Sequence, residues 1–261
     1  MRVINLASGS DGNLTYIESE NCKLLLDMGL SCAETIKRLK LININPEDIH
    51  AILISHEHFD HIKGVDVFSK KYNTPVYAHH EVYKGLNQRF LKVSQENRKP
   101  FDGQSFTLQD ILITPIALPH DVPCFGFSFE NDKKKISILT DLGHTNDRIL
   151  NSIQGSQIVY LESNYDKYLL SKNEHYPLML KRRIAGPFGH LSNIESAKLI
   201  AKLVVSGTRQ IVLAHLSKDN NSPEVAFKSV VDQLYSLGII EGFHVRIDVA
   251  TDKPGVMFKL S

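Results

Sequence analysis

The chain has 261 residues, of which 42% are hydrophobic and 23% are charged, a composition typical of a globular protein that buries a sizeable core. Its 30 basic and 29 acidic residues give a formal net charge of +1, which excludes a global field that would attract nucleic acid nonspecifically. No apolar run approaches the roughly 18 residues of a membrane span, so we expect no membrane partner.

The three cysteines are odd in number and unpatterned, which predicts no disulfide partner and a reducing compartment. The N-terminal segment lacks the long apolar stretch of a signal peptide. We therefore expect a cytoplasmic protein. The sequence predicts no particular oligomeric state.

Strand-like apolar runs alternate with helix-like runs along the whole chain. The predicted strands are residues 1–6, 14–18, 23–27, 51–55, 76–78, 111–117, 125–129, 136–140, 158–161, 210–214 and 244–249. Helix starts are predicted at the capping boxes Ser31/Glu34 and Ser192/Glu195, and at the pairs Asn45-Pro46 and Ser222-Pro223. Residues 131–135 are typical of a hairpin loop. This pattern predicts two packed sheets flanked by helices in one domain over residues 1–261.

The most informative motif is His56-Glu57-His58-Phe59-Asp60-His61, directly after the predicted strand 51–55. Sites in α/β folds usually lie at the carboxyl ends of strands. Imidazole and carboxylate are ligands that borderline divalent metals prefer. The motif therefore predicts a metal site, against the alternative of a solvated, histidine-rich turn.

Three further candidate ligands also follow apolar strands. His120 comes after strand 111–117, Asp141 after strand 136–140 and His215 after strand 210–214. A lone histidine at a strand end is more often a structural residue. Three such residues beside the first motif favour a larger metal site.

The motif His-x-His-x-Asp-His, followed by a lone His, a lone Asp and a last His, resembles the metallo-β-lactamase superfamily over essentially the whole chain. Residues 6–13, 161–164, 189–193 and 215–221 resemble the YycJ/WalJ/VicX group, compact bacterial members associated with DNA exonuclease activity. Tyr165, where many relatives have His, and Leu14, where Cys is frequent, depart from the pattern at positions that bind no metal. The resemblance implies an α/β fold, the four-layer αββα sandwich, in a single domain.

The resemblance also implies two divalent metal ions, zinc or else manganese or iron. It assigns His56, His58 and His120 to one ion, Asp60, His61 and His215 to the other, and Asp141 to a bridge between them. Two ions held close together can share a hydroxide and clamp the oxygens of an in-line displacement. Nitrogen and oxygen ligands without cysteine do not choose among the three metals.

Glu162, after strand 158–161, is either a surface carboxylate or the acid that partners His190 in proton transfer, as the resemblance to superfamily nucleases implies. Gly189 and His190 precede a capped helix, where backbone amides and the imidazole could together contact a phosphate, although His190 could simply pack. We expect Asp60, Glu162 and His190 to be catalytic. Substrate contacts are expected from His190, Ser192, Asn193, Asn164 and Asn220, with a plain capping role for the last segment left open.

These observations predict a hydrolase, most specifically a phosphodiesterase or DNA exonuclease that uses a metal-bridging hydroxide, with DNA as substrate. Basic runs are usually solvated faces, but Lys181-Arg182-Arg183, shortly before His190, is the best candidate for touching nucleic acid. The alternatives are a hydrolase of a small ester, thioester or lactone on the same scaffold, or a noncatalytic metal-binding regulator of a cell-wall signalling system.

Overall fold

The computed structural model describes residues 1–88 and 92–260. The chain forms two compact units, the first comprising Met1–Pro115 with Asp252–Ser261 and the second comprising Ile116–Thr251. The strand β8 (Ile111–Leu118) contains the boundary between them. The assignment of residues 1–261 to a single domain stays a prediction.

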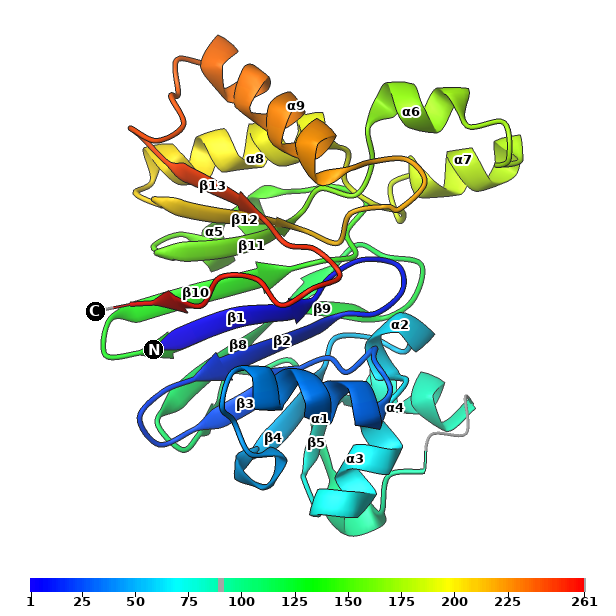
Figure 1. Ribbon diagram of the computed structural model, residues 1–261, viewed down its shortest axis with the longest axis vertical. Helices are drawn as coiled ribbons and strands as arrows, with labels where there is room; N and C mark the ends of the chain where they lie inside the picture. Colours follow the sequence, from blue (N-terminus) through cyan, green and yellow to red (C-terminus); the bar gives the residue numbers. More distant parts are fainter. Residues whose placement is uncertain (89–91, 261) are drawn as a thin grey trace. The chain divides into compact units, whose positions relative to one another are not determined.

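The first unit is built on a mixed sheet with the strand order β14-β1-β2-β3-β4-β5-β6 (Figure 1). Strands β14 to β3 pair antiparallel and strands β3 to β6 pair parallel. The strands are β1 (Arg2–Ala7), β2 (Leu14–Glu18), β3 (Lys23–Leu26), β4 (Ala51–Ile54), β5 (Val76–His79), β6 (Arg98–Phe101) and β14 (Phe258–Lys259). The helices are α1 (Cys32–Leu41), α2 (Phe59–Ile62), α3 (Val65–Tyr72) and α4 (His80–Gln88), with 3₁₀ turns η1 (Pro46–Asp48) and η2 (Gln95–Asn97).

The second sheet has the order β13-β12-β11-β10-β9-β8-β7, with β10 to β13 parallel. Its strands are β7 (Phe106–Leu108), β8, β9 (Cys124–Asn131), β10 (Lys134–Leu139), β11 (Ile158–Glu162), β12 (Gln210–Ala214) and β13 (Arg246–Val249). The helices of the second unit are α5 (Asp147–Ile153), α6 (Lys167–Lys172), α7 (Leu178–Ile184), α8 (Asn193–Val205) and α9 (Pro223–Ser236).

The core of the second unit explains why its parallel strands read as continuous apolar runs. Every residue of β11 is buried, as are Ile211–Ala214 of β12, because a parallel sheet is covered on both faces. The helices α8 and α9 lie side by side (Figure 1), and their buried faces, including Leu203 and Val230, share one apolar cluster with Val159 and Leu213. This packing fixes the carboxyl ends of β10, β11 and β12, from which the candidate site is built.

The predicted α/β class is confirmed by two mixed sheets that are each accompanied by helices, and every predicted strand overlaps an observed one. Ser31, Ser192 and Ser222 cap helices through side-chain bonds as expected, and residues 132–133 form the predicted hairpin turn. Asn45-Pro46 begins only the 3₁₀ turn η1, without a side-chain cap, because the backbone is already extended at Ile49. Strands β6, β7 and β14 were not predicted.

Within the described ranges, no helix combines the length and the apolar character needed to cross a bilayer.

Candidate metal centre

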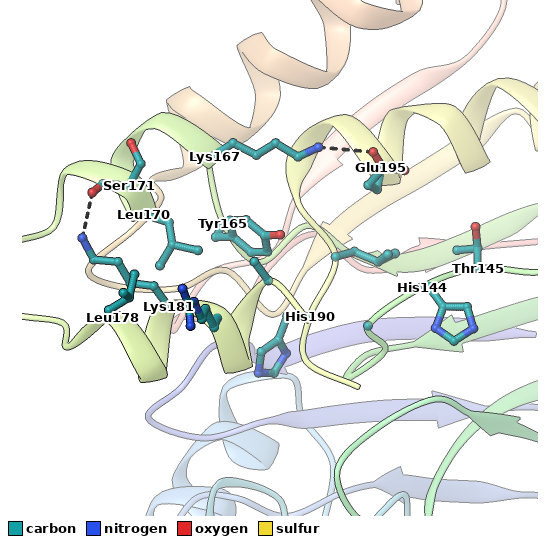
Figure 2. A pocket seen from close by; sticks show the side chains of 14 residues that line it. His144, Thr145, Tyr165, Lys167, Leu170, Ser171, Leu178, Lys181, His190 and Glu195 are labelled. Carbon is teal, nitrogen blue, oxygen red and sulfur yellow. Dashed lines mark hydrogen bonds and ion pairs between the residues drawn. The ribbon is translucent and has the colours of Figure 1, made fainter. Parts of the chain in front are cut away.

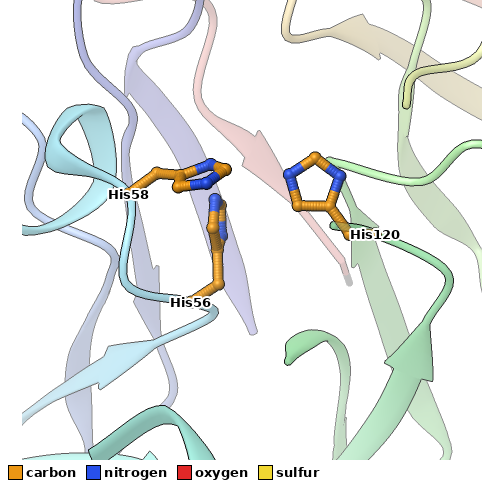
Figure 3. A group of neighbouring side chains, drawn as sticks. All are labelled: His56, His58 and His120. Carbon is orange, nitrogen blue, oxygen red and sulfur yellow. The ribbon is translucent and has the colours of Figure 1, made fainter. Parts of the chain in front are cut away.

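The histidine-rich motif of the first unit lies in the turn from β4 to α2. His58 is the N-cap of α2 and has extended backbone angles, so the chain changes direction inside the motif. His56 and His61 are fully buried. The ring centroids of His56 and His58 lie 4.6 Å apart (Figure 3). Those of His56 and His61 lie 4.1 Å apart. The first unit therefore gathers the three imidazoles of the motif at the end of β4.

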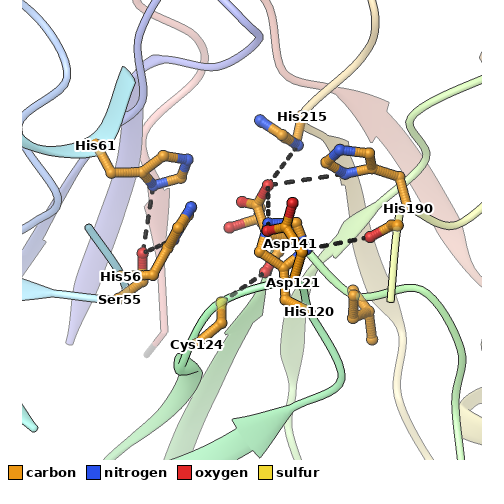
Figure 4. A network of polar contacts seen from close by, with 12 residues as sticks. Ser55, His56, His61, His120, Asp121, Cys124, Asp141, His190 and His215 are labelled. Atoms are coloured by element: carbon orange, nitrogen blue, oxygen red, sulfur yellow. Dashed lines mark hydrogen bonds and ion pairs between the residues drawn. The ribbon is translucent and has the colours of Figure 1, made fainter. Parts of the chain in front are cut away.

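A buried carboxylate orients one of these imidazoles. Asp27 Oδ2 lies 2.7 Å from His61 Nδ1 and accepts a bond of 2.9 Å from the Ser55 hydroxyl, while Asp27 Oδ1 accepts the Ser55 N–H at 2.8 Å. Ser55 Oγ also lies 3.0 Å from His56 Nδ1 (Figure 4). Asp27 and Ser55 thus orient two of the three histidines through contacts with their Nδ1 atoms.

The segment around Asp60 is held by close backbone contacts. Asn13 N–H donates to the Asp60 carbonyl at 2.8 Å, and the Asn13 side-chain amide lies 3.3 Å from Asp60 Oδ2. A Cβ atom on Gly29 would lie 1.6 Å from the Asp60 carbonyl oxygen. Only a glycine lets the chain after β3 approach the motif this closely.

The second unit places its own candidate ligands at strand ends. His120 follows β8, Asp141 follows β10 and His215 follows β12. One ligand atom from each of Asp141, Glu162, His190 and His215 lies within 4.8 Å of the others. His120 Nε2 lies 3.9 Å from Asp141 Oδ1. The predicted ligands of this unit are therefore brought together, along with Glu162 and His190.

Glu162 is the organising group of this cluster. Its carboxylate is fully buried and accepts bonds from three backbone N–H groups and from two imidazoles. His215 Nδ1 and His190 Nδ1 lie 2.8 Å and 2.9 Å from Glu162 Oε1 (Figure 4). The predicted Glu162–His190 contact is present, and Glu162 orients His215 as well.

The electrostatics of this cluster follow from those contacts. Burial raises the pKa of Glu162, but the charge of His190 and the bonds from His190 and His215 outweigh burial and lower that pKa to about 2. Burial conversely lowers the pKa of His190, and the Glu162 carboxylate raises it by more. The lowered pKa of Glu162 and the raised pKa of His190 both favour an ionised carboxylate that accepts hydrogen bonds from imidazole N–H groups.

Three of these polar residues have left-handed backbone conformations. The φ angles of Asp27, Asp141 and His215 are 57°, 65° and 55°. Such values are uncommon outside glycine and cluster at functional sites, where the surrounding structure holds them. Each residue lies one or two positions after a strand, so the left-handed turn changes the direction of the chain at the strand end and orients the side chain.

The donor set fits divalent metal ions. Carboxylate and carbonyl oxygens only accept hydrogen bonds, so the Nδ1 atoms of His61, His215 and His120, which face Asp27, Glu162 and the Gly189 carbonyl, carry the proton. Each ring then presents the Nε2 lone pair, as in the carboxylate–histidine–metal arrangement. The predicted ligands supply nitrogen and oxygen without sulfur, which suits zinc, manganese or iron.

The residues expected to contact substrate differ in accessibility. The His190 side chain is 22% exposed, whereas Ser192, Asn193, Asn164 and Asn220 are at most 5% exposed. The Asn164 amide donates to the His215 carbonyl at 2.8 Å. Asn220 Oδ1 accepts a bond from the side chain of Asn173, and Ser192 caps α8.

Three backbone amides around the start of α8, where a phosphate site was expected, have partners inside the protein. Leu191 N–H donates to Glu162, Asn193 N–H to the Tyr165 carbonyl and Glu195 N–H to the Ser192 hydroxyl. These three amides are not available to a phosphate, and the anion site at the start of α8 stays a prediction.

Sequence reasoning missed several supporting residues. Ser55, Asn13 and the Gly189 carbonyl contact candidate ligands, yet a serine, an asparagine and a carbonyl carry no metal signature of their own. The detectable signal was Asp27, an acidic residue directly after an apolar strand. Its partner, His61, could be identified only from the folded structure.

The Beta-lactamase superfamily domain matches residues 23–216. The chain is 36% identical over 245 residues to the exodeoxyribonuclease YycJ of Bacillus anthracis, covering 92% of each chain. It is 39% identical over 234 residues to the exodeoxyribonuclease WalJ of Streptococcus pneumoniae, covering 88% of this chain and 86% of the relative. The chain belongs to the metallo-β-lactamase superfamily and to its YycJ/WalJ group.

Solved structures agree with this membership at the level of the fold. The metallo-β-lactamase fold protein YhfI of Bacillus subtilis has a TM-score of 0.74 at 15% identity and covers 99% of both chains. Zinc-bound PqqB of Methylobacterium extorquens has a TM-score of 0.75 at 15% identity, with full coverage of both chains. These structures confirm the predicted fold type. The family match and the YycJ and WalJ relatives confirm the assignment to metal-dependent hydrolases.

Proposed function

We propose that this hydrolase is a dinuclear metal-dependent phosphodiesterase, specifically a DNA exonuclease. The observation that carries the proposal is the extent of its likeness to two relatives named exodeoxyribonuclease, which reaches 36–39% identity over 88–92% of this chain. The donor chemistry of both units supports it.

In this proposal the chain holds two divalent ions. The proposed ligands, as assigned from the superfamily resemblance, are His56, His58, His120, Asp60, His61, His215 and the bridging Asp141. When bound, such ions supply Lewis acidity that activates water and neutralises phosphate charge.

The residues of the chain have distinct proposed roles. Asp60, with a side chain 25% exposed, binds metal and orients the attacking water. His190 combines exposure with the Glu162 contact, so it can contact the phosphodiester and deliver a proton to the leaving oxygen. Glu162 is too buried to touch substrate and acts through His190 and His215. Asn164, Asn193, Ser192 and Asn220 position the loops from the interior.

The test is nucleotide release from DNA by the purified protein with added Mn²⁺ or Zn²⁺. We expect His58→Ala to abolish release, whereas His175→Ala, which alters an exposed histidine outside the ligand set, should match the parent. Equal activity of His58→Ala and the parent would contradict the metal mechanism. Turnover of esters or lactones without turnover of phosphodiesters would overturn the nuclease assignment.

A further inference from the structure

A cavity of about 810 Å³ in the second unit includes His190 in its wall (Figure 2). Its other walls come from α6, α7, the first turn of α8 and residues 143–145. Its volume falls within the range of about 300–1,000 Å³ that is usual for small-molecule sites. The cavity therefore extends from a proposed catalytic group into a space that the metal ligands do not use.

One side of this cavity is cationic. Lys181 Nζ donates to the Ser171 carbonyl at 2.7 Å, which steadies the ammonium without neutralising it (Figure 2). Arg182 is exposed and forms no ion pair with any residue in 1–88 or 92–260. The carboxylate in the wall, Glu195, is shared between Lys167 at 3.3 Å and another lysine outside the wall at 3.0 Å. The surplus positive charge favours an anionic ligand.

The same cavity also has an apolar surface. Tyr165, Leu170 and Leu191 are buried residues that line it. Leu178 also lines it but is 62% exposed, so this leucine has little core packing of its own. A ligand with a flat apolar part and an anionic part matches both surfaces.

We propose that this cavity binds the unpaired terminal nucleotide of a DNA strand, next to the phosphodiester that reaches His190. The base lies against Tyr165, Leu170 and Leu178, and a phosphate contacts Lys181 and Arg182. This inference rests on the proposed nuclease function and names the end of the substrate that the site accepts.

The occupant follows from the combination of surfaces. Inorganic phosphate would use only the cationic side, and an uncharged ester would leave both cations unused. A base paired within a duplex is stacked and cannot enter a cavity, so single-stranded or frayed ends should be preferred.

Nucleotide binding can be followed by the fluorescence of one introduced tryptophan, because the chain itself contains none. Leu178→Trp places a single fluorophore in the cavity wall. We expect saturable quenching by dAMP in the zinc-loaded protein, with deoxyadenosine and inorganic phosphate each at least about 10-fold weaker. Calorimetric titration of the parent protein checks that the added indole does not create the site.

The charge contribution is tested by replacing both Lys181 and Arg182 with alanine, with Lys202→Ala on the last turn of α8 as the matched control. We expect the double variant to raise the Kd for dAMP and the KM for single-stranded DNA at least about 10-fold, with kcat within about 3-fold. Hydrolysis of bis(4-nitrophenyl) phosphate should stay unchanged, because this small diester needs no terminal subsite.

The outcomes separate the two proposals. If the double variant binds dAMP and degrades DNA like the control, the cavity proposal is wrong and the nuclease function stands. If dAMP binding depends on both cations but the parent hydrolyses no phosphodiester, the cavity stands as a nucleotide site and the proposed function fails. Faster digestion of blunt duplex ends than of single strands would also overturn the preference for an unpaired end.

Discussion

Replacing Glu162 with glutamine should destabilise the protein, because the amide cannot accept all the bonds that the carboxylate accepts. Glu162 Oε1 receives three N–H donors and Oε2 receives two, from Leu142 and Leu191. In the better orientation the new NH₂ group faces those two backbone donors. Each buried donor left unsatisfied costs about 1–3 kcal/mol, so the free energy of unfolding should fall by about 2–6 kcal/mol.

That loss is a large part of the 5–15 kcal/mol that stabilises a typical domain. The measurement is urea unfolding followed by circular dichroism, with Glu130→Gln as the control. Glu130 is 40% exposed and pairs with Lys135 on the surface, so its substitution should change stability by less than about 1 kcal/mol. If Glu162→Gln lies within about 1 kcal/mol of the parent, the five-bond arrangement does not exist in solution.

Three further substitutions test other parts of the structure. Asp27→Asn keeps a residue that tolerates the left-handed conformation but weakens the hydrogen bond to His61. The free energy of unfolding should therefore fall by about 1–3 kcal/mol, and zinc affinity, measured by chelator competition, should fall by about 10- to 100-fold. Unchanged zinc affinity would contradict the orienting role of Asp27. Gly29→Ala drives a Cβ atom into the Asp60 carbonyl and should cost about 1–3 kcal/mol in urea unfolding, with weaker zinc binding. Lys133→Gly relieves a φ of 64° in the β9–β10 turn and should raise the free energy of unfolding by about 0.5–1 kcal/mol, a gain that would be absent if the turn were not left-handed.

The fold was predictable where burial dominates the choice of residue. Buried parallel strands such as β11 and β12 need apolar side chains on both faces, so their sequences alone located them. Strand β6 escaped prediction because it forms the edge of its sheet, where polar residues and Pro100 are tolerated. Strands β7 and β14 have only three and two residues, too few to show a period.

The candidate site was predictable to the extent that its chemistry is local. The histidine-rich motif is visible because four residues of metal-ligand types lie within six positions, and the single polar residues at strand ends gain weight from its presence. The pairing of His61 with Asp27, 34 positions apart, and of His215 with Glu162, 53 positions apart, depends on strand order. The order of the strands in the sheet cannot be read from the spacing of residues in the sequence.

The backbone donors at the start of α8 depend on the fold in the same way. A capped helix start with a preceding glycine suggested available N–H donors for a phosphate, but whether a donor is available depends on every acceptor that folding brings near it. Here the Glu162 carboxylate, from β11, accepts the Leu191 amide, and the Tyr165 carbonyl accepts the amide of Asn193. The bond from the Leu191 amide also holds the Glu162 carboxylate, which in turn orients the His190 imidazole. With these amides taken, the positive charge near His190 that a substrate phosphate can use in the proposed subsite comes from Lys181 and Arg182 of α7, which line the cavity.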